Sequence, residues 1–223
     1  TKDHSRPTVL DGSGMPDEYG ALYLGAEDEK KIYLTFDAGY GNENVESILN
    51  TLKKHNATAA FFILPGIIKN SPELVMRMAE EGHTVCNHTS SHGDMSRITD
   101  IERFKAELTG LEELYRERTG HEMTKYFRPP EGSFSIKTLE FCKELGYTPV
   151  FWTFAYPDWD MKRQPDPAAS VQKVLSGVHD GMVMLMHPMS RTNALILDEV
   201  LTTLENDGYT FGTLDELAEC NRR

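Results

Sequence analysis

Five polar residues, of types that carry catalysis or bind ligands, each follow an apolar run in this sequence of 223 residues. They are Asp37, His88, Arg128, Asp158 and His187. A single Asp at the end of a strand most often bonds its own turn. Because the pattern recurs at the predicted carboxyl ends of several strands, where barrels carry their chemistry, it indicates one shared site.

His88 and His92 form a candidate pair of metal ligands. They are four residues apart, so a helical turn directly after the strand would place both imidazoles on one side. Two neutral imidazoles at that spacing suit Zn²⁺ or a similar first-row divalent ion. The competing interpretation is two surface histidines in a loop, and the spacing alone favours neither. Asn87, Thr89 and Ser91 are expected to support the pair through hydrogen bonds.

His187 and Arg128 are candidates for acid–base chemistry and its support. His187 follows a fully apolar strand, so we expect its ring at the rim with a perturbed pKa, as suits a general acid. A core histidine bonded to a carbonyl is the alternative. Arg128 precedes two prolines and is therefore rigidly presented, so its guanidinium would orient a carboxylate such as Asp158 or Asp37.

An aromatic residue next to Asp158 is a candidate for contact with a sugar. Trp159 offers a flat apolar wall of the kind that sugar-binding clefts use. A tryptophan in a loop more often serves packing, so this residue alone does not indicate a sugar site.

Strands and helices alternate along the chain that carries these residues. Apolar runs predict strands over 31–37, 58–64, 84–87, 125–128, 148–154, 182–186 and 209–211. Amphipathic and capped segments predict helices over 44–55, 71–81, 100–118, 135–145, 167–176, 192–206 and 214–219. Strand followed by helix, seven times, is typical of a parallel α/β architecture. Seven or eight such units predict a closed or nearly closed barrel of the TIM type.

Composition and charge limit the partners. The chain has 35 acidic and 23 basic residues, a net charge of -12, without a basic patch, which argues against nucleic acid and anionic membranes. No apolar run approaches the ~20 residues of a membrane span. No Gly-x-Gly-x-x-Gly follows the first strand and no P-loop occurs, which weakens a nucleotide site. Three cysteines, without metal-type spacing, do not indicate a disulfide framework.

The domain organisation is simple. No linker divides the chain, so we predict one domain over 26–223 after an irregular arm over 1–25 whose last residues, 21–25, form a short edge strand. The chain begins at Thr1 rather than Met, which we interpret as a processed or trimmed product. A signal peptide or lipid anchor would then have been removed with the missing segment.

At these residues the sequence resembles the polysaccharide deacetylases with a NodB-homology domain, carbohydrate esterase family 4. The resemblance covers about 32–217, and five motifs occur in the family's order. Residues 35–39 match TFDDG, 88–92 match HSxxH, 128–132 match RPPxG, 155–159 match DxxDW in part, and 185–187 match Leu-x-His. Each motif is weak alone, but the ordered set is specific.

The resemblance implies a distorted (β/α) barrel of seven or eight units and metal-dependent removal of N- or O-acetyl groups from glycans. By position, Asp37 would be the general base and His187 the general acid, with Arg128 and Asp158 in support. The acid–base pair is what hydrolysis of an amide requires, because a carboxylate takes the proton of water and an imidazolium protonates the departing nitrogen.

The family also implies a metal ion and a substrate surface. His88 and His92 would bind the divalent ion, with Zn²⁺ the first expectation and Co²⁺ or Mn²⁺ as alternatives. The backbone N–H of Glu131 would stabilise the oxyanion. The residues expected to contact the substrate are Tyr40, Glu131, Trp159 and Leu185.

Two positions depart from the common family pattern. Ala38 stands where a second Asp usually binds the metal, so metal affinity should fall and water should fill the position. Ala155 replaces the first Asp of the fourth motif. Both departures, and the tracts 23–40 and 151–159, resemble the subgroup of de-N-acetylases that form muramic δ-lactam. That subgroup acts on N-acetylmuramic acid in peptidoglycan stripped of its stem peptide, as in spore cortex.

We therefore expect an N-acetylmuramic acid deacetylase of peptidoglycan, with lactam formation as a following step. It would act outside the cell or in the cell envelope, as a monomer. One alternative is a deacetylase of N-acetylglucosamine polymers or acetylated xylan. Another is a glycan-binding domain that lost catalysis with the change to Ala38. Retention of Asp37, His187 and Arg128 favours an enzyme, since binding alone needs no acid–base pair.

Overall fold

A curved parallel sheet forms the centre of the computed structural model, which describes residues 18–222. Its strands are β1 Lys31–Ala38, β2 Ala60–Ile63, β3 Thr84–Asn87, β4 Tyr126–Phe127, β5 Thr148–Pro149, β6 Met182–Met186 and β7 Thr210–Phe211. The order is β5-β4-β3-β2-β1-β6, with β7 beside β1. Most of the predicted arm, 1–17, lies outside the described residues.

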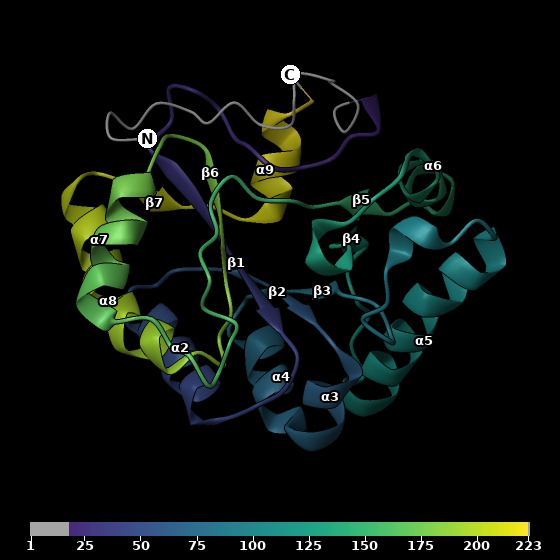
Figure 1. Cartoon of the computed structure of the whole chain (residues 1–223), viewed down its shortest axis with the longest axis horizontal. Helices are drawn as coiled ribbons and strands as arrows, with labels where there is room; N and C mark the ends of the chain where they lie inside the picture. The colour runs from purple at the N-terminus through teal and green to yellow at the C-terminus, as the bar shows by residue number, and fades with distance from the viewer. Residues whose placement is uncertain (1–17, 223) are drawn as a thin grey trace.

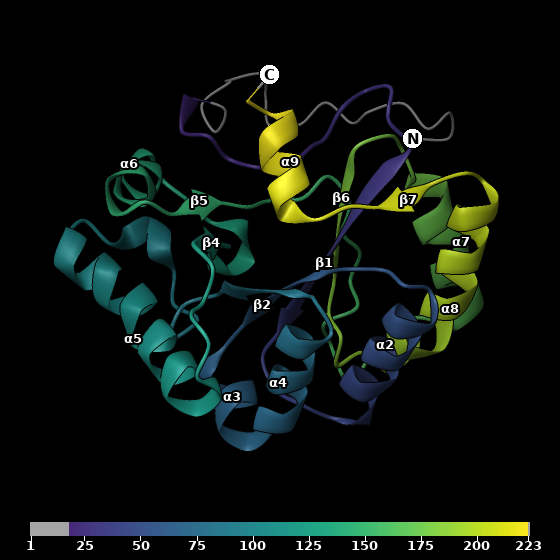
Figure 2. The same cartoon turned by 180° about the vertical axis from the view of Figure 1, so that it is seen from behind.

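Helices pack around this sheet. They are α2 Glu43–Lys54, α3 Pro65–Asn70, α4 Pro72–Glu80, α5 Ile101–Thr119, α6 Ile136–Leu145, α7 Pro167–Gly177, α8 Arg191–Asn206 and α9 Leu214–Cys220. Figures 1 and 2 show an arc of helices on the outer face, from α7 and α8, through α2, α4 and α3, to α5. Helix α9 instead adds Leu214 and Leu217 to the cluster inside the curve of the sheet. Strands and helices alternate along the chain as predicted.

The central strand β1 is buried on both faces, which explains why its residues are mostly apolar. Alternate residues Ile32, Leu34, Phe36 and Ala38 join the cluster that packs against the helices. On the other face Tyr33 belongs to a smaller cluster inside the curve of the sheet. The strand thereby packs against both clusters. Its polar end lies at the carboxyl edge of the sheet.

The predicted barrel is confirmed as a half-barrel, because β5 and β6 are not hydrogen-bonded ladder partners. Isolated bridges span the gap instead: Leu22 pairs with Val150, and Leu24 pairs with Met182. The strands predicted over 21–25 and 148–154 are therefore shorter than expected. Pro149 has no N–H to donate, which limits the ladder of β5.

Two residues define the ends of α3 and α4. Pro65 begins α3, where a proline at the first position costs no hydrogen bond. Ser71 precedes α4, but its side chain makes no capping hydrogen bond. Its Oγ instead lies against Gly41, where an added Cβ would come within 2.2 Å.

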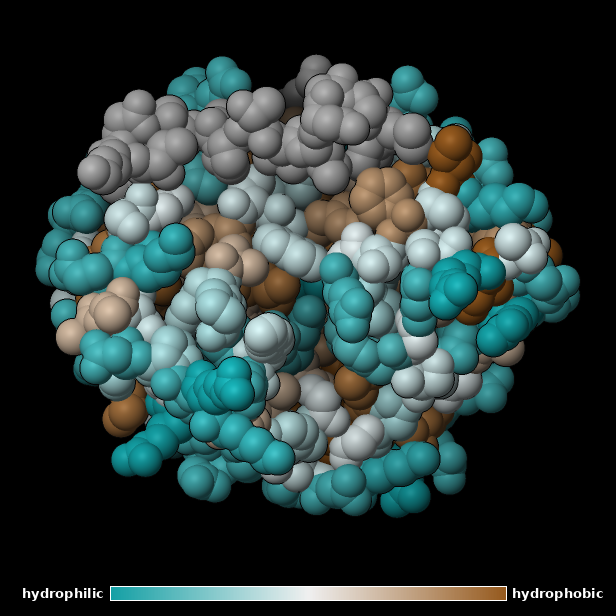
Figure 3. All heavy atoms as spheres, viewed as in Figure 1, coloured by the Kyte–Doolittle hydropathy of each residue, from teal (hydrophilic) through white to brown (hydrophobic). Residues whose placement is uncertain are grey.

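Within residues 18–222 no helix combines the length and the apolar character needed to cross a membrane. Cys86 and Cys142 are buried free thiols, and Cys220 is a partly exposed one. Figure 3 shows, on the face it presents, hydrophobic residues scattered among hydrophilic ones.

His55, directly after α2, ties that helix to α8. Its Nδ1 lies 3.0 Å from Glu205 Oε2 and its Nε2 lies 2.9 Å from Asp198 Oδ1. Burial lowers the pKa of the imidazole, but the hydrogen bonds and charges of the two carboxylates outweigh it and raise the pKa of His55. The contact is therefore strongest when His55 is protonated.

Replacing His55 should remove a pH-dependent part of the folding stability. Since its folded-state pKa lies above the ordinary value of about 6.5, the stabilisation is complete below that pH and is lost as the pH rises through the folded-state pKa. Between about pH 5.5 and about pH 9, Tm should fall more in the wild type than in His55→Gln. His121→Gln, at an exposed position, should behave like the wild type. Equal pH dependence in His55→Gln and the wild type would contradict this role.

Candidate active site

The predicted polar residues gather at the carboxyl edge of the sheet. Asp37 lies near the end of β1, His88 and Arg128 directly follow β3 and β4, and His187 directly follows β6. Asp158 reaches the same edge from the connection between β5 and β6. Asp37 and His187 come directly after Phe36 and Met186, which are register partners in the β1–β6 ladder, so they lie side by side at this edge. The predicted convergence is therefore present in the structure.

The guanidinium of Arg128 is the centre of this arrangement and is fully buried. Its Nη1 donates to Asp37 Oδ1 at 2.8 Å, and its Nη2 donates to Thr35 Oγ1 at 2.9 Å. Further hydrogen bonds run from Nη2 to Phe151 O and from Nε to Val150 O, both at 3.2 Å. The carboxylate that Arg128 orients is thus that of Asp37 and not that of Asp158.

Aromatic rings enclose the same guanidinium. Its central carbon lies 4.1 Å from the ring centre of Phe62 and 5.4 Å from that of Trp152. A planar cation stacks on such faces, which an ammonium group cannot reproduce. Gly132, at φ 68°, makes room for Trp152, because a Cβ there would lie 2.7 Å from the indole ring.

Asp37 is held as a carboxylate. Burial acts to raise its pKa, but Arg128 first, then His88 and His187, outweigh that effect and hold the pKa of Asp37 below its ordinary value. The carboxyl group is therefore ionised near neutral pH and able to accept a proton. Thr35 was not among the predicted site residues. The signal that points to it is its position two residues before Asp37, on the same face of β1.

His88 is fixed in one tautomer by the backbone of Arg128. Its Nδ1 lies 2.8 Å from the carbonyl oxygen of Arg128, which can only accept, so Nδ1 carries the proton. The lone pair is then on Nε2, which lies 3.6 Å from Asp37 Oδ2. Burial lowers the pKa of His88, and the ring is neutral, as a metal ligand must be.

The loop that carries His88 and His92 is not the predicted helical turn. Thr89 and His92 adopt left-handed backbone conformations, with φ 74° and φ 55°. The two imidazoles are still neighbours, with ring centres 5.1 Å apart and ring planes at 75°. His88 is buried, whereas His92 is exposed to solvent.

Hydrogen bonds to the loop backbone hold this conformation. Thr89 N donates to Asn87 Oδ1 and His92 N donates to Thr89 Oγ1, both at 2.9 Å. Ser91 binds the carboxylate of Glu107 on α5 through its N and its Oγ. The polar residues around the pair thus support the loop, rather than bonding to the imidazole rings as a ligand-supporting shell would.

His187 and Asp158 form a second pair, in which Asp158 is buried and His187 is partly exposed. His187 Nδ1 lies 2.7 Å from Asp158 Oδ1, and His187 N donates to Asp158 Oδ2 at 2.8 Å. Burial lowers the pKa of the imidazole, but the hydrogen bond and the charge of Asp158 outweigh burial and raise the pKa of His187. The ring is bonded to a carboxylate, so it is not a core histidine satisfied by a carbonyl.

Comparison with known proteins agrees with this geometry. A family profile described as polysaccharide deacetylase matches residues 25–150. The chain belongs to the polysaccharide deacetylase family. It is 39% identical over 205 residues to the peptidoglycan-N-acetylmuramic acid deacetylase PdaA of Bacillus subtilis, which covers 92% of this chain and 78% of that protein. The solved structure of PdaA, a family 4 carbohydrate esterase, gives a TM-score of 0.92 at 37% identity over 97% of this chain and 93% of that chain.

Relatives with other descriptions also match this chain. The peptidoglycan-N-acetylglucosamine deacetylase PgdA of Listeria monocytogenes is 35% identical over 192 residues, 86% of this chain and 40% of that protein. BA3943 of Bacillus anthracis, described as a family 4 pseudoenzyme, gives a TM-score of 0.79 at 28% identity over 88% of this chain and 68% of that chain. The predicted family and α/β fold are confirmed.

The deacetylase family is generally metal-dependent, and the donors at this site allow only a small ligand set. Within residues 18–222 no group of three His, Cys, Asp or Glu side chains is placed to hold a metal ion. His88 Nε2 and the neighbouring ring of His92 supply nitrogen donors. Ala38, in the position of the usual second Asp, is fully buried within the apolar cluster. The site fits a divalent ion through two imidazoles, one ligand fewer than most catalytic zinc sites have.

The residues expected to contact substrate differ in exposure. Tyr40 is 42% exposed and Trp159 is 55% exposed, so both rings can meet a ligand. Glu131 is exposed in the 3₁₀ turn Pro130–Gly132 and has φ 57°, a left-handed backbone position. Leu185 is only 5% exposed and offers little surface to a glycan.

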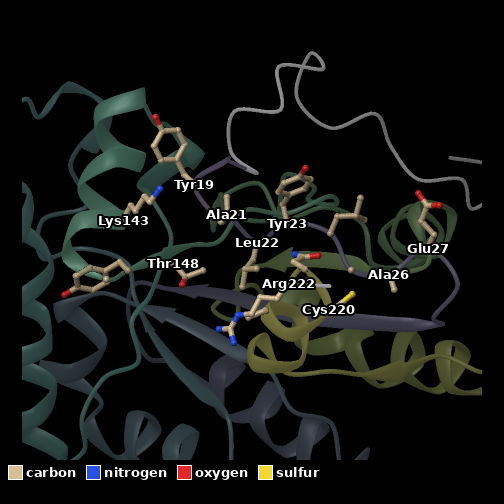
Figure 4. A pocket seen from close by; sticks show the side chains of 17 residues that line it. Tyr19, Ala21, Leu22, Tyr23, Ala26, Glu27, Lys143, Thr148, Cys220 and Arg222 are labelled. Atoms are coloured by element: carbon tan, nitrogen blue, oxygen red, sulfur yellow. The ribbon is translucent and has the colours of Figure 1, made fainter.

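A separate hollow lies at the opposite end of the strands. It has a volume of about 800 Å³ and is lined by residues that include Tyr19, Tyr23, Lys143, Thr148 and Arg222 (Figure 4). Thr148 begins β5, so this hollow belongs to the amino-terminal edge of the sheet. None of the predicted site residues lines it.

Removing the guanidinium of Arg128 should destabilise the fold strongly. Arg128→Met leaves the buried carboxylate of Asp37 unpaired, a change that typically costs about 3–5 kcal/mol of unfolding free energy. Urea denaturation of the apo protein would measure the loss. The matched control is Lys125→Met, which removes a cation that is 53% exposed and paired with Glu112. Equal losses in the two variants would show that Arg128 does not hold the site together.

Proposed function

We propose that this protein hydrolyses the N-acetyl group of N-acetylmuramic acid residues in peptidoglycan. The observation that carries the proposal is a carboxylate and an imidazole at one edge of the sheet, each bonded to a buried partner of opposite charge, Arg128 and Asp158. Asp37 has a lowered pKa and His187 a raised one. At neutral pH the first is a proton acceptor, and the second retains a proton to a higher pH than a free histidine. Amide hydrolysis needs both at once.

Each side chain of the site has a part in this reaction. Asp37, oriented by Arg128, takes the proton from the attacking water. His187, held by Asp158, gives its proton to the departing sugar nitrogen, so the amine leaves as a neutral group. The backbone N–H of Glu131 stabilises the negative charge on the acetyl oxygen in the tetrahedral intermediate.

His88 and His92 would hold the divalent ion, with Zn²⁺ the first choice and Co²⁺ or Mn²⁺ as alternatives. When bound, the ion supplies a Lewis acid that polarises the acetyl carbonyl and lowers the pKa of the attacking water. The Arg128 carbonyl keeps the His88 tautomer ready for coordination. Because only two imidazoles are in place and Ala38 adds no oxygen, we expect weak metal affinity.

The choice of N-acetylmuramic acid rests on similarity within the family. The relative PdaA carries that activity in its name and spans nearly the whole chain. Ala38 and Ala155 are the departures expected of the subgroup that forms muramic δ-lactam, so lactam closure is a following step in this proposal. Tyr40 and Trp159 would flank the glycan. The substrate places the protein in the cell envelope or outside the cell, and we expect it to act as a monomer.

Two observations favour other functions strongly enough to test. PgdA, 35% identical, is described as acting on N-acetylglucosamine. BA3943, with the same fold, is described as a pseudoenzyme. Acetate release from stem-peptide-free peptidoglycan, chitooligosaccharide and acetylated xylan, each with and without chelator, separates the three cases. Release from peptidoglycan alone is expected. Preference for another substrate, or no release at all, would overturn the proposal.

Loss of the base or the acid should abolish most of the turnover. Asp37→Asn and His187→Ala are each expected to lower kcat for acetate release by ~10²-fold or more, the usual contribution of a positioned acid or base. Circular dichroism checks that the variants are folded. The control His121→Ala changes an exposed histidine and should keep full turnover. If acetate release survives both changes, the assigned roles are wrong.

The metal ligands can be tested without an activity assay. His88→Ala should weaken Zn²⁺ binding to the apo protein by at least tenfold in calorimetric titration, since one of two imidazole donors is lost. Ala38→Asp should lower the Tm of the apo protein, because the new carboxylate is buried, and Zn²⁺ should then raise its Tm more than that of the wild type. An unchanged isotherm in His88→Ala would remove that residue from the ligand set.

A further inference from the structure

Asn193 is a buried amide beside the candidate acid, and no motif of the sequence points to it. It lies in the first turn of α8 and is fully buried. The helix begins after Ser190, whose side chain accepts a hydrogen bond from Asn193 N. This cap fixes the first turn of α8, which directly follows the loop from His187.

The side chain of Asn193 bonds to both members of the Asp158–His187 pair. One N–H of its Nδ2 donates to Asp158 Oδ2, and the other donates to the backbone oxygen of His187 at 2.9 Å. Asp158 therefore receives hydrogen bonds on both oxygens: His187 Nδ1 on one, and His187 N and the amide on the other. The carboxylate cannot rotate without breaking several of them.

The hydroxyl of Tyr156 determines which way this amide points. Asp158 Oδ2 and the His187 carbonyl are both acceptors, so only the NH₂ group of Asn193 can face them. The amide oxygen is left on the other side, where Tyr156 donates its O–H to it. Tyr156 is itself buried at 8% exposure, so water does not compete freely for this bond.

We propose that Asn193, anchored by Tyr156, is a positioning residue that keeps Asp158 aligned with the imidazole of His187 for proton transfer. The role of His187 as general acid comes from the proposed function, and this inference rests on it. Asn193 touches no reacting atom in this scheme. It acts by holding the carboxylate in the one orientation that accepts from Nδ1.

Loss of the amide has a defined effect on the titration of His187. The charged groups that act on this ring are Asp158, Asp37 and Arg128. Asp158 contributes most to keeping the proton on the ring, through its hydrogen bond to Nδ1. If the carboxylate turns away, the pKa of His187 falls towards the ordinary value of about 6.5. The alkaline limb of the kcat profile, which reports the acid in the complex with substrate, should move to lower pH with it.

The test uses Asn193→Leu, which keeps a similar volume, and Tyr156→Phe, which removes only the hydroxyl. Nitrogen-15 NMR titration of the imidazole rings reports the pKa of His187, with His187→Ala used to assign its signals among the eight histidines. Asn193→Leu should lower this pKa by about half a unit or more and lower kcat about tenfold, with KM nearly unchanged. Tyr156→Phe should shift both quantities in the same direction by less.

The control is Asn44→Leu. Its amide donates to Met189 O at 2.9 Å, in the same loop after His187, without a bond to Asp158. It should leave the His187 titration unchanged. An unchanged or higher His187 pKa in Asn193→Leu would overturn the inference, and so would a loss of activity without movement of the alkaline limb. If Asn193→Leu does not fold, an unshifted titration in Tyr156→Phe overturns it.

A failure of the proposed function and a failure of this inference would give different results. Full acetate release by His187→Ala would remove the acid role of His187, whereas the NMR titration would still show whether Asn193 holds the Asp158–His187 pair.

Discussion

The buried charge of Arg128 is the constraint on which the rest of the site depends. A guanidinium with no exposed surface is tolerable only when its charge is paired and its N–H groups have acceptors. Here Asp37, Thr35 and the backbone carbonyls of 150–151 supply them. The carbonyl of Arg128 also fixes the tautomer of His88. One residue thus joins the candidate base, a candidate metal ligand and the edge of the half-barrel.

At two places in this site, a buried partner of opposite charge sets the protonation state of a titratable group. At Asp37 a buried cation keeps a carboxylate ionised, and at His187 a buried carboxylate keeps an imidazole protonated to higher pH. Burial alone would act against both charges. The partners therefore decide the protonation states, and the orientation of each partner matters as much as its presence. Arg128 is oriented by rigid backbone, and Asp158 by the amide of Asn193.

The departures from the common family pattern are compatible with this arrangement. Ala38 is fully buried among apolar side chains, so the missing Asp leaves no unpaired polar group behind. Ala155 is exposed, where a methyl group costs little. Neither change disturbs the Asp37–Arg128 or the Asp158–His187 pair. The candidate acid–base groups are thus structurally independent of the position that Ala38 occupies.

Local sequence determined most of the elements, because period, caps and turns are properties of neighbouring residues. The bounds of β3 and β6, and the positions of Asp37, His88, Arg128 and His187 at strand ends, could be predicted in that way. The tertiary structure alone decided which groups meet. Arg128 bonds Asp37 across 91 positions of the chain, and Asn193 reaches Asp158 across 35. Such pairings depend on how distant segments pack, so no local sequence pattern predicts them. Packing likewise shortened β5 and gave the loop after β3 its left-handed turns.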